Sequence, residues 1–190
     1  MPLDSESRWR LVRRLKASGE TAPEGEIVIR KGTVDDLSQV CEIYNYYVRN
    51  SVVTFDLEPL TLEDWRSKFQ HISSMELPFL IAVSPSGQIL GFAYVAPWRQ
   101  KAAYRRTVED SIYLRPAAIG KRVGSKLLDV LIRESKAAGV REIVAVISDK
   151  GAEASVKLHE AYGFKHQGHL GKVGFKFGRW LGTVLMQKSL

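Results

Sequence analysis

The sequence is poor in the residues that build covalent crosslinks and metal centres. Its 190 residues include one cysteine, Cys41, and four scattered histidines. A single cysteine cannot form a disulfide within the chain, and the histidines form no cluster, so we expect neither a disulfide scaffold nor a metal site. Such a chain suits a reducing compartment, and we therefore expect a cytoplasmic protein.

Long apolar runs are also missing. No stretch of about 18 apolar residues is present, and the N-terminus carries charges where a secretory signal would have its apolar segment. We therefore expect no membrane partner. The 45% hydrophobic and 26% charged residues are ordinary for a globular domain, and a chain of this length ordinarily forms one domain.

The charge balance is basic, with 28 Lys and Arg against 21 Asp and Glu, a formal net charge of +7. Such a charge suits nucleic acid, an anionic membrane or a small molecule that carries phosphate. The basic residues fall in separate segments, at 8–16, 99–106 and 121–126, and no RNA-binding signature or tandem zinc finger accompanies them. We therefore expect no nucleic-acid partner.

The chain divides into a basic N-terminal extension, residues 1–25, and a domain, residues 26–190. In the extension, four apolar residues could line one side of a short helix: Trp9, Leu11, Val12 and Leu15. A solvated or docking helix and a membrane-surface helix are both open, and the second is the weaker because so few apolar residues bury little area in a lipid surface.

Residues 26–190 alternate between strand and helix periodicity, which is typical of an α/β protein. We expect strands at 27–31, 79–83, 89–95, 107–114, 142–148, 164–170 and 181–188. Helices are expected after Thr33, after Thr61, at 122–138 and at 152–162, where Thr33–Asp36 and Thr61–Asp64 have the spacing of capping boxes. The segment 172–180 is expected to be a loop between the last two strands.

The segment RPAAIGKRVGSKLL follows the strand at 107–114 and leads into a helix. Free amides of a first helical turn, the positive end of the helix dipole and the side chains of Lys121 and Arg122 together favour an anion. An ordinary strand-to-helix loop is the alternative. The segment has neither the spacing of a Walker A loop nor that of a dinucleotide fingerprint.

Five segments in order carry a resemblance to a known family. They are NSVVTFDLEP at 50–59, WRQKAAYR at 98–105, TVEDSIYLRP at 107–116, ASVKLHEAYGF at 154–164 and KFGRWLGTVLMQ at 176–187. Over residues 27–188 the chain resembles the GNAT superfamily of N-acetyltransferases, and within it the phosphinothricin and methionine sulfoximine acetyltransferases. The resemblance implies a mixed, mostly antiparallel sheet with helices on both faces, a splay between two strands, and acetyl-CoA as co-substrate in that splay.

The same resemblance implies which residues hold acetyl-CoA. The pantetheine arm would pair with the strand that ends in Ile112, Tyr113 and Leu114. The pyrophosphate would lie over Gly120, Lys121, Arg122, Val123, Gly124 and Ser125. Two features depart from the family pattern: its signature Q/R-x-x-G-x-G/A has Ile119 and Arg122 here in place of the basic residue and first glycine, and Ala152 stands where relatives have a cofactor-binding asparagine.

For catalysis the resemblance implies direct attack of an α-amine on the thioester, with Glu109 as the general base that removes the amine proton. Glu109 as a solvated or ion-paired strand residue is the alternative. Asp110 is the rival candidate for the base, although strand alternation places it on the opposite face. His159 is a second candidate for proton transfer, with a core or helix-surface histidine as its alternative. Tyr162 is a candidate hydrogen-bond donor to the departing thiolate.

The acceptor would be a small amino-acid-like molecule. Arg99 and Lys101 fall where the family holds acidic groups of its substrate, and these side chains suit a carboxylate or a phosphinate. The remaining candidates for the acceptor side are Phe55, Gln100, Tyr104, Asp110, Ser111 and Trp180. The resemblance also implies a homodimer whose interface borders the active site, with the segment 178–180 contributing.

Two other functions stay open from the sequence. One is an inactive member of the family that binds a small ligand or a protein partner, which the departures at Ile119, Arg122 and Ala152 would suit. The other is acetylation of a protein or peptide terminus, which keeps the chemistry and changes the acceptor. Resemblance in fold does not decide between acceptors.

Overall fold

The computed structural model describes residues 26–190, so the predicted basic extension and its helix lie outside the described residues. The strands form a seven-stranded sheet in the order β1-β2-β3-β4-β5-β7-β6. They are β1 (Val28–Lys31), β2 (Phe79–Val83), β3 (Ile89–Pro97), β4 (Thr107–Leu114), β5 (Glu142–Ser148), β6 (Lys165–Lys176) and β7 (Arg179–Ser189). The α-helices are α2 (Leu37–Asn50), α3 (Leu62–Ser74), α4 (Val123–Ala137) and α5 (Glu153–Ala161).

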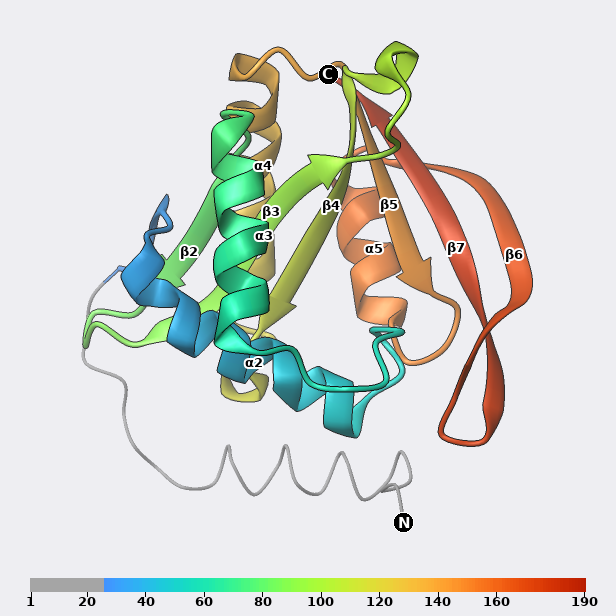
Figure 1. Cartoon of the computed structure of the whole chain (residues 1–190), viewed down its shortest axis with the longest axis horizontal. Coiled ribbons are helices and arrows are strands. Elements are labelled where there is room, and N and C mark those ends of the chain that lie inside the picture. The colour runs from blue at the N-terminus through green and yellow to red at the C-terminus, as the bar shows by residue number, and fades with distance from the viewer. Residues whose placement is uncertain (1–25) are drawn as a thin grey trace.

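Helices cover both faces of this sheet (Figure 1). On one face, α2 and α3 pack their apolar residues onto the aromatic side chains of β2 and β3, with Trp65 and Phe92 fully buried. On the other face, α4 packs Leu127, Leu128 and Leu131 onto β2 to β5. Neighbouring strands are antiparallel except β4 and β5, which are parallel. The predicted mixed, mostly antiparallel sheet is therefore confirmed.

The sheet opens between its two parallel strands. The pairing of β4 with β5 covers Thr107↔Glu142, Val108↔Ile143 and Glu109↔Val144 and ends there. Beyond this point β4 stays paired with β3 as far as Leu114, and β5 stays paired with β7 as far as Ser148. Figure 1 shows the two strands diverging from the start of β4 toward its end. This opening is the splay that the family resemblance implies.

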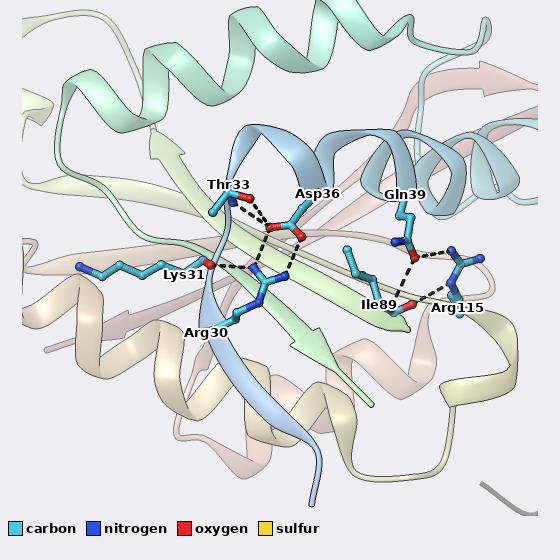
Figure 2. Close-up of polar contacts among 7 residues, drawn as sticks. All are labelled: Arg30, Lys31, Thr33, Asp36, Gln39, Ile89 and Arg115. Carbon is cyan, nitrogen blue, oxygen red and sulfur yellow. Dashed lines mark hydrogen bonds and ion pairs between the residues drawn. The ribbon is translucent and has the colours of Figure 1, made fainter. Parts of the chain in front are cut away.

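Both predicted capping boxes are present, and one of them is part of a larger network. Thr61 and Asp64 bond reciprocally at the start of α3. At Thr33, the carboxylate of Asp36 accepts hydrogen bonds from the backbone N–H and the hydroxyl of Thr33. The same carboxylate accepts two bonds of 2.7 Å from Arg30 (Figure 2). This network joins β1 to the helical turn that precedes α2.

Arg115 fixes the end of β4, where the candidate anion loop begins. Its Nε donates to the Ile89 carbonyl at 2.7 Å, and its guanidinium also donates to the Gln39 side chain (Figure 2). The Tyr47 hydroxyl donates to the Leu114 carbonyl. These contacts hold the last residues of β4 against β3 and α2, so the loop that follows starts from a fixed position.

The expected loop at 172–180 is wrong. β6 and β7 form one long hairpin whose turn lies at Phe177 and Gly178, both in the left-handed region with φ of +50° and +74°. Phe175 pairs with Trp180 across the hairpin, with ring centroids 5.3 Å apart. The sequence did not indicate a strand here because glycine and lysine disfavour strands. Contacts between side chains of β6 and β7 stabilise the strand instead.

No helix within residues 26–190 is long and apolar enough to cross a membrane. The strand expected at 164–170 is the first part of β6, which continues to Lys176. The other expected strands and the helices expected at 122–138 and 152–162 agree with the structure within two residues at each end, and helices follow Thr33 and Thr61 as expected.

The Arg30–Asp36 network leads to a first prediction. The guanidinium of Arg30 and the groups of Thr33 lower the pKa of the buried Asp36 carboxyl, against the opposing effect of burial. A lowered folded-state pKa contributes stability above the unfolded pKa, near 4, and loses it as pH falls through the folded value. We expect Asp36→Asn to reduce the free energy of unfolding by about 1–3 kcal/mol at pH 7, measured in urea.

The difference in the free energy of unfolding between wild type and Asp36→Asn should begin to shrink as pH falls through about 4, the unfolded pKa, and should close only below the lowered folded pKa, where the wild-type carboxyl also becomes neutral. Asp35→Asn is the matched control because Asp35 is exposed. Equal effects of the two substitutions would contradict a stabilising role for the network.

Candidate functional site

A cavity of about 500 Å³ occupies the space between the separated strands. Its walls are the second half of β4, the second half of β5, the residues around the start of α4 and the first turns of α5. The lining includes these residues predicted from the sequence: Glu109, Asp110, Ser111, Ile112, Tyr113, Leu114, Gly120, Arg122, Val123, Gly124, Ser125, Ala152 and His159. The splay therefore brings together the candidate base and almost all of the candidate cofactor residues.

Two strand edges face this cavity without a partner strand in the described sheet. Past Glu109, β4 has β3 on one side only, and past Val144, β5 has β7 on one side only. An unpaired edge offers backbone N–H and C=O groups to an extended ligand, as in strand addition. The cavity can therefore bind a long, narrow molecule that carries amide groups.

The loop at 115–122, between β4 and α4, has a backbone conformation that suits anion binding, and we call it the anion loop. Gly120 and Arg122 are in the left-handed region, with φ of +81° and +61°, and Val123 begins the helix directly afterwards. No side chain caps the first turn of α4, so its amides are free to bind an anion at the positive end of the helix dipole. Lys121 is exposed and does not line the cavity.

Arg122 is the notable residue of this loop, because a left-handed backbone favours glycine. A side chain in that conformation costs roughly 1–2 kcal/mol. Arg122 thus has a backbone conformation that glycine ordinarily takes, and the residue lines the cavity. Gly124 serves packing, because a Cβ there would lie 3.3 Å from Leu158 of α5.

Glu109 is the last residue of β4 that pairs with β5, and its side chain faces the layer formed by α2 and α3. It lies opposite Ala96 of β3, on the same face as Tyr94. Burial raises its pKa to about 6, and the negative charge of Asp110 adds to this, while the positive charge of Lys68 opposes it. A half-buried carboxylate with a pKa near neutrality suits proton abstraction.

Asp110 faces the opposite layer, as strand alternation predicts, and pairs with His159 of α5. Asp110 Oδ2 and His159 Nε2 are 2.9 Å apart, and His159 Nδ1 donates to the Ser155 carbonyl at 2.7 Å. Burial disfavours charging of the imidazole, but the Asp110 carboxylate and the Ser155 carbonyl outweigh it, so the pKa of His159 is raised. Both ring nitrogens of the charged imidazole then donate, and the pair is buried.

The expected hydrogen bond from Tyr162 to a leaving thiolate is not supported. The Tyr162 hydroxyl donates to the Ser125 carbonyl at 2.8 Å, and Tyr162 does not line the cavity. The hydroxyl proton of Tyr162 is therefore already used in a hydrogen bond that joins the end of α5 to the start of α4.

The remaining acceptor candidates lie outside the cavity lining. Arg99, Gln100, Lys101 and Tyr104 are exposed in the segment that precedes β4, at the opposite end of the strand from the anion loop. Phe55 packs its ring on Gly174 of β6, and Trp180 is 53% exposed beside Phe175. The structure thus separates a cofactor side, within the splay, from these side chains.

Some lining residues were not found from the sequence. The strand at 142–148 was expected, but not that Ala145–Ser148 form a cavity wall. Tyr47 and Val53 also line the cavity. Only the neighbour relation between β4 and β5 could have indicated the wall, and that relation is not local in sequence.

Three comparisons with known proteins agree with this geometry. The model of the GNAT acetyltransferase domain matches residues 29–185. A phosphinothricin N-acetyltransferase of Alcaligenes faecalis is 42% identical over 156 residues, 82% of this chain and 79% of that protein. An L-methionine sulfoximine/L-methionine sulfone acetyltransferase of Pseudomonas paraeruginosa is 37% identical over 162 residues, 85% of this chain and 94% of that protein.

A solved structure is similar over the same region. It is a GNAT superfamily phosphinothricin acetyltransferase from Sinorhizobium meliloti in complex with AcCoA, with a TM-score of 0.83 and 39% identity, covering 86% of this chain and 88% of that one. The splayed sheet, the anion loop and these matches together show that the chain belongs to the GNAT superfamily of acetyltransferases.

Proposed function

We propose that this acetyltransferase moves the acetyl group of acetyl-CoA to the α-amine of a small amino-acid-like acceptor. Relatives of this chain are named phosphinothricin and methionine sulfoximine acetyltransferases. The observation that carries the proposal is the position of Glu109, a half-buried carboxylate with a raised pKa at the point where β4 and β5 separate.

The cavity lining supports a binding mode for acetyl-CoA. Its pantetheine amides would bond the free edge of β4 along Ile112–Leu114, and its pyrophosphate would lie on the amides of Gly120 to Ser125 with Arg122 beside it. Arg122 has the left-handed backbone that glycine adopts without strain, which supports a cofactor-binding loop over the alternative of an inactive family member.

The reaction is a direct transfer. Glu109 takes one proton from the acceptor's ammonium, and the free amine attacks the thioester carbonyl. The tetrahedral intermediate expels the CoA thiolate as the amide forms, and the second proton lost by the nitrogen converts the thiolate to the CoA thiol. A covalent acetyl-enzyme is not needed. Cys41 is unsuited to form one, because burial raises the pKa of its thiol and the thiol bonds the Leu60 carbonyl, outside the cavity.

His159 acts as a positioning residue in this scheme. Its two ring nitrogens are held by Ser155 and Asp110, so it has no free nitrogen for proton transfer. Its positive charge offsets the carboxylate next to Glu109. Arg99 and Lys101 stay proposed contacts for the acidic groups of the acceptor, and the homodimer and cytoplasmic location stay predictions.

The role of Glu109 is tested by Glu109→Gln. We expect kcat to fall by about 10²–10⁴-fold, because the amide of glutamine cannot accept the proton. The assay measures CoA release with phosphinothricin or methionine sulfoximine as the acceptor. In the wild type kcat should fall about tenfold per pH unit below about pH 6, where Glu109 becomes protonated. Glu134→Gln on α4 is the control, and full activity of Glu109→Gln would exclude the base assignment.

The role of Arg122 is tested by Arg122→Gly. Relief of the left-handed strain should raise the free energy of unfolding by about 1 kcal/mol. Loss of the guanidinium should weaken acetyl-CoA binding by about tenfold in calorimetry. Tighter cofactor binding by the glycine variant would show that the side chain obstructs the pyrophosphate.

The role of His159 is tested by His159→Gln. The substitution leaves Asp110 buried without its cationic partner, so we expect the free energy of unfolding to fall by about 3–5 kcal/mol in urea at pH 6. The folded pKa of His159 is raised, so the pair stabilises the fold below the unfolded value near 6.5 and loses this effect as pH rises through the folded value. The difference in the free energy of unfolding between wild type and His159→Gln should therefore become smaller in alkaline solution. A variant of normal stability without activity would instead assign proton transfer to His159.

A further inference from the structure

A lysine that no motif indicated lies on the same side of the sheet as Glu109. Lys68 is on α3, and its ammonium lies over three aromatic rings. The distances from Nζ to the ring centroids are 4.9 Å for Trp65, 5.7 Å for Tyr94 and 5.9 Å for Tyr44. These rings come from three different elements, so the ammonium is held over the aromatic cluster between α2, α3 and β3.

The aromatic cluster leaves the positive charge available to an anion. Among residues 26–190 no carboxylate lies within ion-pair distance of Lys68 Nζ. The ring faces attract the ammonium but do not neutralise it. The side chain is half-buried, so an anion bound there would be partly shielded from water and more strongly attracted than at an exposed lysine.

The strand register connects Lys68 with the base. Tyr94, one of the three rings, pairs with Ser111, and Ala96, two residues on, pairs with Glu109. Of the described charges, those of Asp110 and Lys68 act on Glu109, and Lys68 is the positive one. On α3 itself, Asp64 is near Lys68, and its carboxylate is bonded by Thr61. The ammonium of Lys68 therefore lies over a ring two residues along β3 from the residue that pairs with Glu109, on the same face of the sheet.

An α-amino acid requires such a cation beside the base. Its amine nitrogen and carboxylate oxygens are three bonds apart, through the α-carbon and the carboxyl carbon, a distance of roughly 3 Å. When the amine is at Glu109, the carboxylate must lie next to it. Arg99 and Lys101 are exposed, lie before β4 and are outside the cavity lining.

We propose that Lys68 determines acceptor specificity by binding the α-carboxylate of the amino acid whose amine is placed at Glu109. This rests on the proposed function. Arg99 and Lys101 then serve the acidic group at the far end of the acceptor side chain, so an amino acid with a second acidic or strongly polar group uses both sets of cations.

The experiment compares two acceptors, L-methionine sulfone and its α-carboxamide, which keeps the amine and loses the negative charge. The variants are Lys68→Met, which keeps the aliphatic stem over the rings, Lys68→Arg, which keeps the charge, and Arg66→Met as the control on the same helix, where the side chain is 52% exposed. We expect Lys68→Met to raise KM for the acid by roughly 10- to 100-fold and to change KM for the carboxamide little. Lys68→Arg should stay within a few-fold of the wild type, and Arg66→Met should not change.

A pH profile gives a second, independent measurement. Burial and the charge of Asp110 raise the pKa of Glu109, and the charge of Lys68 lowers it. Without that charge, in Lys68→Met, the pKa of Glu109 should rise, and the acidic limb of the kcat profile should move to higher pH. An unfolding curve for each variant separates this effect from loss of the fold.

The outcomes separate the two proposals. Equal losses on the acid and the carboxamide would overturn the role of Lys68 in specificity, as would no loss at all. Binding of methionine sulfone is also followed by calorimetry without turnover. A wild type that binds the acid but transfers no acetyl group would refute the proposed function, while loss of that binding in Lys68→Met would still support Lys68. A wild type that binds no amino acid would overturn the Lys68 assignment itself.

Discussion

The site depends on a short parallel pairing, Thr107–Glu109 of β4 against Glu142–Val144 of β5. Each strand is tied to another neighbour over its full length, β4 to β3 and β5 to β7, so neither strand collapses when the pairing ends. The separation creates both the cavity and two free strand edges. It also places Glu109 at the inner end of the opening, where burial raises its pKa.

Strand alternation divides the charges at this inner end between two environments. Glu109 faces the aromatic layer of α2 and α3 with Lys68, and Asp110 faces α5, where it is paired with His159. Neighbouring carboxylates thereby acquire different roles: one stays unpaired and titrates near neutrality, and the other is fixed in a buried pair. At the outer end, Arg122 has a strained left-handed backbone, and its positive side chain lies beside the cavity.

Local patterns predicted the elements well, and non-local contacts account for what was missed. The capping threonines, the apolar strand 142–148 and the segment TVEDSIYL are found as expected because their signals are local. The family resemblance indicated Glu109, and the residues themselves indicated the loop at Arg122; both residues line the cavity. The hairpin at 172–180, the bond from Tyr162 to Ser125 and the position of Lys68 over the rings depend on contacts between distant segments, which leave no periodicity to read.

The central claim is that the free edge of β4 inside the splay receives acetyl-CoA. Hydrogen exchange of the β4 amides, measured with and without acetyl-CoA, tests it most directly. We expect the amides of Asp110–Leu114 that point away from β3, and those of the first turn of α4, to gain protection when the cofactor binds, because the pantetheine arm and pyrophosphate then bond them. Saturable binding that leaves these amides unprotected, or protection confined to other strands, would contradict the claim.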